Sequence, residues 1–167
     1  MKQTAQHLQS SSADHLGKIF FRRVQELGDK TFVKLQRGER FEEVSWWDFG
    51  TRVRGAISGL YSLRLRKGER IGIIGQNSLE WLCTDMATLA GGLPNVVIAP
   101  TQSDIMLLKI LCHSSCRAVF VGDEGTAGRL LNLKDQLPTL STIIVMDGTG
   151  SGLPRRLTFA ELISRGP

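Results

Sequence analysis

The feature that most constrains this chain is a repeated unit, in which a short apolar run is followed by a helical pattern with its own cap. Such alternation is typical of right-handed crossovers between parallel strands. The sequence therefore predicts an α/β fold, an open parallel sheet with flanking helices. The apolar runs have the composition of strands buried on both faces, and they cover residues 70–75, 96–98, 118–121 and 142–145.

The segments between these runs carry helix start and stop signals. Ser78 can cap a helix over residues 79–90, which Gly91 and Gly92 would close. A capping box at 101–104 predicts the next helix, a weaker pattern covers 124–133, and a further box at 158–161 begins a short last helix. The second of these helices is expected to bury one side, made of Ile105, Leu108, Leu111 and Cys112.

The first third of the chain predicts a different arrangement. A helix over 16–27, capped by Ser12 or Asp14, ends at Gly28. Two β-prone runs then flank a glycine turn and indicate a small β-hairpin, and a capping box begins a helix that extends to about residue 63. We expect a flexible N-terminus over residues 1–12 and one α/β domain over 13–167. The hairpin runs are 31–36 and 40–44, and the box is 45–48.

Size and cysteine usage limit the class of protein. A chain of 167 residues can bury roughly 70% of its unfolded surface, so it needs no disulfide or metal to fold. Three cysteines, an odd number, favour a reducing compartment. The first 15 residues have no apolar run of the signal-peptide kind, and we expect a cytoplasmic protein, with peripheral membrane association of a longer parent left open.

A net charge of +5 raises the question of nucleic-acid binding. The densest basic cluster has no interleaved aromatic residues on which bases could stack. We therefore interpret it as a solvated turn between a helix and a strand, and we expect no nucleic-acid partner. The cluster consists of Arg64, Arg66, Lys67 and Arg70.

Two glycine-containing segments are candidates for nucleotide or phosphate binding. Gly72 and Gly75 lie where a dinucleotide site keeps its glycines, but the full G-x-G-x-x-G motif is absent, and close helix packing explains them equally. The loop 147–156, predicted to be flexible, could bind phosphate through free amides and Arg155 or Arg156. It lacks the P-loop spacing, which favours a plain connector.

Residues 112–116 combine two cysteines, a histidine and two serines. A zinc site needs at least three protein ligands in suitable geometry, and no second Cys/His pair lies nearby, so thiols buried at a helix end are the expected state of Cys112 and Cys116. His113 could act as the general base for a nucleophilic serine or cysteine only with a carboxylate to orient it, and the sequence indicates none. Asn77 follows a strand, where ligands bind in open sheets, although it can equally brace the turn.

The order of several short motifs resembles the amino-terminal region of the AMP-forming acyl-CoA synthetases, over about residues 13 to 166. The opening helix and residues 41–49 are most similar to the long-chain fatty-acid branch. Residues 93–100 depart from the family, because Pro94 comes early and Ala99 replaces an aromatic or polar residue. The matching motifs are residues 46–49, 67–74, 77–81, 90–92, 99–101, 115–123 and 157–163.

The resemblance implies a ligase that converts a carboxylate and ATP to an acyl-adenylate, which coenzyme A then turns into a thioester. The parent enzyme is expected to use ATP, Mg²⁺ and coenzyme A. The family's phosphate-binding loop follows the helix that residues 158–164 resemble, so we assign no catalytic, cofactor-binding or metal-binding residue to this chain and expect it to be inactive alone. Its expected partners are the rest of the ligase chain and the fatty acid or other carboxylate.

Two alternatives remain open. An independent phosphate- or nucleotide-binding α/β module would use the loop 148–156, and an interaction domain without a ligand would use a surface patch. A sheet that lacks strands supplied by other sequence exposes an apolar edge, which predicts self-association.

Overall fold

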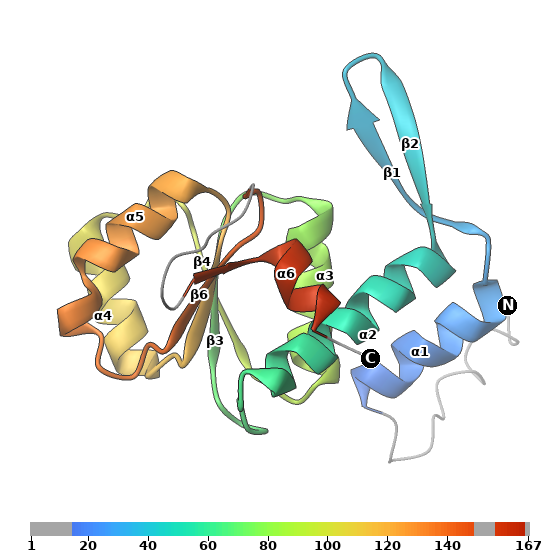
Figure 1. The fold of residues 1–167 in the computed structure, drawn as a ribbon. Helices are drawn as coiled ribbons and strands as arrows, with labels where there is room; N and C mark the ends of the chain where they lie inside the picture. The colour runs from blue at the N-terminus through green and yellow to red at the C-terminus, as the bar shows by residue number, and fades with distance from the viewer. Residues whose placement is uncertain (1–14, 149–155, 166–167) are drawn as a thin grey trace, which may run out of the picture.

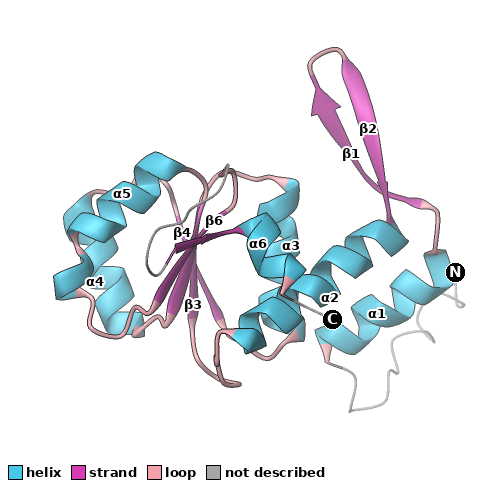
Figure 2. Cartoon of the chain, viewed as in Figure 1, coloured by secondary structure: helices cyan, strands magenta, loops and turns pink. Residues whose placement is uncertain are grey.

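A computed structural model describes residues 15–148 and 156–165 of the chain. Five parallel strands form one sheet in the order β4-β3-β5-β6-β7, and two antiparallel strands form a separate hairpin. The expected α/β fold, with flanking helices and a small hairpin, is confirmed (Figure 1, Figure 2). The sheet strands are β3 (Ile71–Ile74), β4 (Asn95–Ile98), β5 (Ala118–Val121), β6 (Thr142–Val145) and β7 (Arg156–Thr158).

The helices cover both faces of the sheet. Helices α2 (Trp46–Ser62), α3 (Leu79–Ala90) and α6 (Phe159–Ser164) share one core with Ile71, Ile73 and Phe120. Helices α4 (Asp104–Ser114) and α5 (Glu124–Asn132) pack on the opposite face, against Ile74, Val119 and Val121. Alternate strand residues thus point into two separate cores, which is why the runs are apolar without interruption.

The hairpin and the first helix form an appendage beside the sheet. Helix α1 (Leu16–Leu27) lies along α2, and the hairpin of β1 (Thr31–Arg37) and β2 (Arg40–Ser45) projects from the body (Figure 1). Gly38 adopts φ +62° in the turn, a conformation that favours glycine. Phe32 stacks on Phe49 with ring centroids 4.3 Å apart and thereby fixes the base of the hairpin to α2.

Three details differ from the sequence-based expectations. Helix α4 begins at Asp104 with Ser103 as its cap, not at the predicted box, because the Ser103 hydroxyl accepts from the Met106 N–H. Its buried residues are Leu107 and Leu111, whereas Ile105 is 69% exposed and Cys112 is exposed. The buried residues of α4 pack on the sheet face with Ile74 and Val119, whereas Ile105 remains outside this core.

The third difference concerns strand β7, which the sequence analysis missed. Residue Arg156 was expected in a flexible loop but begins this strand, and its register partner is Ile143 of β6. Strand β7 has only three residues, one of them aliphatic, which is too few to show the alternation of a strand. Its extended conformation depends instead on pairing with the buried strand β6. The expected flexibility of residues 149–155 and of 1–12 concerns residues outside the described part of the chain, and it stays a prediction.

Thr158 joins β7 to α6 and forms the predicted capping box. Its hydroxyl accepts from the Glu161 N–H at 3.1 Å, and the Glu161 carboxylate accepts from the Thr158 N–H at 2.7 Å. We expect Thr158→Ala to lower the free energy of unfolding by about 1 kcal/mol, because one helix amide loses its acceptor. Chemical denaturation measures the change. The control Thr158→Ser keeps the hydroxyl and should retain most of the stability, and equal losses in both variants would contradict the capping role.

Candidate functional site

The carboxyl edge of the sheet contains a topological switch point between β3 and β5. The chain leaves β3 through α3 towards β4, and it leaves β5 through α5 on the opposite face towards β6. Open α/β sheets bind ligands in the crevice that such divergent connections create. A crevice of about 380 Å³ lies here, lined by Gln76, Ser78, Glu80, Gly122, Asp123, Met146 and Asp147.

Two glycines bring the strand ends close together beneath this crevice. A Cβ on Gly75 would lie 2.7 Å from Met146 Cε and 3.2 Å from Gly122 Cα. The Gly122 N–H donates to the Ile74 carbonyl at 2.7 Å, which extends the pairing of β3 and β5 past the strands. Gly72 has a different role, because a Cβ there would lie 3.2 Å from Leu111 Cδ2 of α4. Close packing therefore accounts for both glycines that were candidates for a dinucleotide site.

Helix caps occupy the two flanks of the crevice. The Ser78 hydroxyl accepts from the Trp81 N–H at 3.0 Å, and Asp123 Oδ1 accepts from the Thr126 N–H at 2.7 Å. The predicted capping role of Ser78 is thus confirmed. Glu80 and Glu124 lie in the first turns of α3 and α5, where a carboxylate is favourable near the positive end of the helix dipole.

The charge of the crevice determines which ligands it suits. Glu80, Asp123 and Asp147 contribute carboxylates, and no Lys or Arg of residues 15–148 or 156–165 lines it. These side chains do not fit a phosphate or a free carboxylate group, which they would repel. Binding of an anionic substrate at this edge therefore requires cationic groups from other sequence or a bound metal ion.

Arg156, a candidate phosphate ligand, already has a partner. Its guanidinium forms an ion pair with Glu124 at the start of α5, and its side chain is only 11% exposed. Removing that partner from a nearly buried arginine would be costly, so Arg156 is not free to neutralise phosphate. Residues 149–155 of the candidate loop, Arg155 included, lie outside the described residues.

Asn77 lies at the second cavity near this edge. A groove of about 470 Å³ runs between strand β1 and the start of α3. Its walls are mainly aliphatic and aromatic, and Ser78 belongs to both this groove and the crevice. The groove is lined by Val33, Leu35, Asn77, Ser78, Leu79, Trp81 and Leu82.

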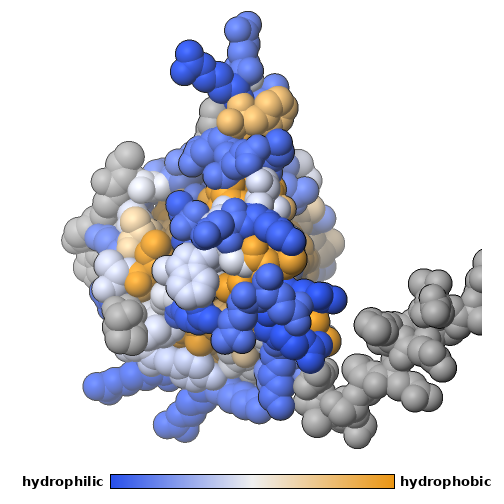
Figure 3. Space-filling view, turned by 90° about the vertical axis from the view of Figure 1, so that its right-hand side faces the viewer, coloured by the Kyte–Doolittle hydropathy of each residue, from blue (hydrophilic) through white to orange (hydrophobic). Residues whose placement is uncertain are grey.

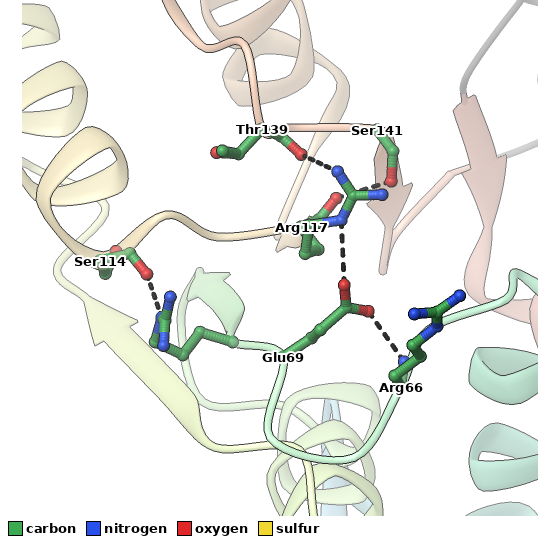
Figure 4. A network of polar contacts seen from close by, with 7 residues as sticks. Arg66, Glu69, Ser114, Arg117, Thr139 and Ser141 are labelled. Atoms are coloured by element: carbon green, nitrogen blue, oxygen red, sulfur yellow. Dashed lines mark hydrogen bonds and ion pairs between the residues drawn. The ribbon is translucent and has the colours of Figure 1, made fainter.

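The basic cluster of residues 64–70 lies at the opposite, amino edge of the sheet, where the close-up in Figure 4 shows a polar network. Glu69 accepts from the Arg66 N–H at 2.8 Å and lies 3.3 Å from Arg117 Nε. The Arg117 guanidinium also donates to the Thr139 carbonyl at 3.1 Å, and the Arg70 guanidinium donates to the Ser114 carbonyl. These contacts hold together the segments that lead into strands β3, β5 and β6. They agree with the predicted turn between α2 and β3.

The cysteines differ in their exposure to solvent. The Cys112 thiol is exposed, contrary to expectation, and donates to the Gln136 carbonyl at 3.3 Å. Cys116 is buried, as expected, with its sulfur 3.2 Å from the Ser114 hydroxyl. Within the described part of the chain, no group of three or more His, Cys, Asp or Glu side chains is placed to hold a metal ion.

Burial should make the three thiols react very differently. It raises the pKa of the Cys83 thiol to about 12 and also raises the pKa of Cys116. At mildly alkaline pH we therefore expect a thiol reagent to label Cys112 rapidly, and the other two only after unfolding. Mass spectrometry of the intact protein gives the number of labelled cysteines, and the Cys112→Ser variant is the control. Rapid labelling of the folded Cys112→Ser variant would contradict this arrangement.

Comparisons with known proteins first define a class for this fold. The A domain of the carboxylic acid reductase from Segniliparus rugosus, solved with AMP and a co-purified carboxylic acid, superimposes with a TM-score of 0.79. The match has 17% sequence identity and covers 94% of this chain and 31% of that one. At this identity the match shows the fold alone.

The sequence comparison is more specific. The profile of the AMP-binding enzyme family matches residues 20–165, and the chain belongs to this family. The long-chain-fatty-acid–CoA ligase ACSBG2 of Xenopus laevis is 25% identical over 150 residues, which cover 89% of this chain and 20% of that protein. The mitochondrial medium-chain acyl-CoA ligase ACSF2 of Bos taurus is 29% identical over 128 residues, covering 66% and 20%. The chain thus spans about a fifth of the length of these relatives.

Proposed function

We propose that this chain supplies the amino-terminal α/β layer of an ATP-dependent, AMP-forming acyl-CoA ligase and is inactive without the rest of that enzyme. The family match over residues 20–165 carries the proposal. The charge of the crevice supports it, because the charged side chains among its described lining residues are all carboxylates, which repel an attacked phosphate.

The chemistry explains why more sequence is needed. A carboxylate is a poor electrophile, and its attack on the α-phosphate of ATP builds negative charge that needs Mg²⁺ and cationic or N–H donors for stabilisation. The ligase would use ATP, Mg²⁺ and coenzyme A, with these groups held by residues outside this chain. The role of residues 15–148 and 156–165 is then to position the carboxyl edge of a rigid sheet.

The remaining ligase sequence is the proposed partner, and the hairpin is a suitable place for it. A two-stranded hairpin that projects from the body is marginally stable unless other elements pack on it. Phe41 on β2 is 65% exposed, and Trp47 at the start of α2 is 51% exposed. The side that bears the hairpin is mostly hydrophilic, with separate hydrophobic spots between hydrophilic residues (Figure 3). These exposed rings would be covered by sequence that is not in this chain.

For the substrate we propose a long-chain fatty acid, on the resemblance to that branch and on relatives such as the ACSBG2 ligase. Matches to medium-chain ligases make chain length the property to test. For the location we propose the cytoplasm, on the cysteine usage. No helix within residues 15–148 or 156–165 is long and apolar enough to cross a membrane.

The test compares residues 1–167 with the longest protein that the same gene encodes. Thioester formation is measured with ATP, Mg²⁺ and coenzyme A, using an octanoate and a palmitate substrate. We expect the longer protein to prefer palmitate and residues 1–167 to form no product. A preference for octanoate would overturn the substrate class, and a gene product of 167 residues alone would overturn the ligase assignment.

A further inference from the structure

We propose that the basic turn of residues 64–70 is an electrostatic docking surface for an anionic membrane, which places the amino edge of the sheet on the lipid. The turn joins α2 to β3 and projects from that edge of the body (Figure 1). This inference concerns the surface of residues 1–167 and does not depend on the proposed ligase activity. The four cations of the turn are all exposed, namely Arg64, Arg66, Lys67 and Arg70.

The positive charge of the turn is not neutralised by neighbouring carboxylates. The one carboxylate of the turn, Glu69, lies 3.3 Å from Arg117 Nε and is thus paired with a cation outside the turn. The Arg70 guanidinium donates to the Ser114 carbonyl, which is uncharged. None of the four cations of the turn forms an ion pair with a carboxylate of residues 15–148 or 156–165. The turn therefore presents four uncompensated charges to solvent.

Arg64 has a backbone conformation that an arginine adopts only at a cost in energy. Its φ is +61°, in the left-handed region, directly after the end of α2, where glycine is the common residue. The Arg64 side chain is exposed and has no hydrogen-bond or ion-pair partner in the described part of the chain. The guanidinium therefore does not offset the cost of the turn, which favours a role for its charge at the surface.

The shape and composition of the turn suit a lipid surface. A membrane presents anionic headgroups over a plane, so a projecting cluster of cations can meet several of them without a shaped pocket. The turn has no aromatic residue on which a nucleic-acid base could stack. Leu65 is buried, so it is not available to insert into the lipid. The contact is therefore electrostatic, and salt should weaken it.

The charges at the opposite edge of the sheet favour the same orientation. The crevice at the carboxyl edge is lined by Glu80, Asp123 and Asp147, and none of its described lining residues is a Lys or Arg. An anionic membrane attracts the basic edge and repels the acidic one. The protein would therefore bind with its crevice facing the aqueous phase.

Co-sedimentation with lipid vesicles tests the proposal. The probes are vesicles of phosphatidylcholine mixed with phosphatidylserine, and vesicles of phosphatidylcholine alone. We expect residues 1–167 to bind the first and not the second, with an affinity that falls as salt is raised. Arg66→Gln combined with Lys67→Gln should weaken binding about 25-fold, because each cation near such a surface contributes about fivefold.

Two further variants separate the location of the charge from its amount and from folding. Lys30→Gln combined with Arg40→Gln removes the same charge from exposed residues of the hairpin region, at the other end of α2, and should retain most of the affinity. Arg64→Gly should weaken binding about fivefold while the melting temperature stays the same or rises, because glycine adopts this backbone freely.

Three results with vesicles would overturn the proposal. They are no binding to the anionic vesicles at low salt, equal binding to both kinds of vesicle, and equal losses from the two double variants. Duplex DNA is tested in the same buffer. Binding of DNA but not of vesicles, lost in the variant with Arg66→Gln and Lys67→Gln, would assign the turn to nucleic acid and would also overturn the proposal.

Discussion

Gly59→Ala is expected to lower the free energy of unfolding by about 2 to 3 kcal/mol, as overpacked sites do when backbone must move. Gly59 lies in α2 where α6 crosses it, and a Cβ there would lie 2.2 Å from the Leu162 carbonyl oxygen and 2.9 Å from its carbonyl carbon. These are backbone atoms, so no side-chain rotation can relieve the contact. The helices must separate, which opens the core around the buried Leu60 and Leu162.

The matched control for this variant is Gly128→Ala in α5. Its added Cβ would meet nothing within 4 Å, and the same substitution should stabilise the protein by about 0.5 to 1 kcal/mol through reduced backbone entropy. Urea denaturation followed by circular dichroism measures both. Opposite signs for the two variants are expected, and a stabilising Gly59→Ala would contradict the close packing of α2 and α6.

Phe120→Ala should cost still more, about 3 to 5 kcal/mol, because a large side chain is removed from a site that cannot collapse. Phe120 lies in the central strand β5, is fully buried, and contacts Phe159 of α6 with ring centroids 6.4 Å apart. Strand β5 lies between β3 and β6, so the cavity would open in the middle of the sheet. Much of the chain's total stability would be lost.

The exposed Phe41 provides the comparison for Phe120. Phe41→Ala removes the same atoms from a residue that is 65% exposed, and a change within about 0.5 kcal/mol is expected. Thermal unfolding of both variants, each at the same low concentration to limit association, measures the difference. Similar losses at the two positions would show that burial in the sheet does not determine stability here.

The fold was predictable from sequence where local signals agreed with the tertiary contacts. The apolar run of β3 is followed by the cap Ser78 of α3, and there pattern and packing indicate the same elements. Strand β7 has no such agreement, because its order comes from pairing with β6. Helical periodicity indicates an apolar stripe on α4, but which of its residues the sheet covers depends on how the helix is placed over the strands: Leu107 and Leu111 are buried, and Ile105 is exposed.

The candidate site was harder to predict, because it depends on strand order. Gln76, Asp123 and Asp147 each follow a predicted strand, so the sequence places them at one edge of a parallel sheet. It does not say that β3 and β5 are neighbours with β4 outside them, and this order creates the switch point. The ion pair between Arg156 and Glu124 joins residues of separate elements and could not be inferred from spacing.

Exchange of labelled pyrophosphate into ATP that depends on the fatty-acid substrate tests the central claim most directly. This exchange reports formation of the acyl-adenylate without the thioester step. Purified residues 1–167, with Mg²⁺ and palmitate, are compared with the longest product of the same gene. We predict exchange by the longer protein and none above the buffer rate by residues 1–167. Exchange by residues 1–167 alone, lost on unfolding, would contradict the account.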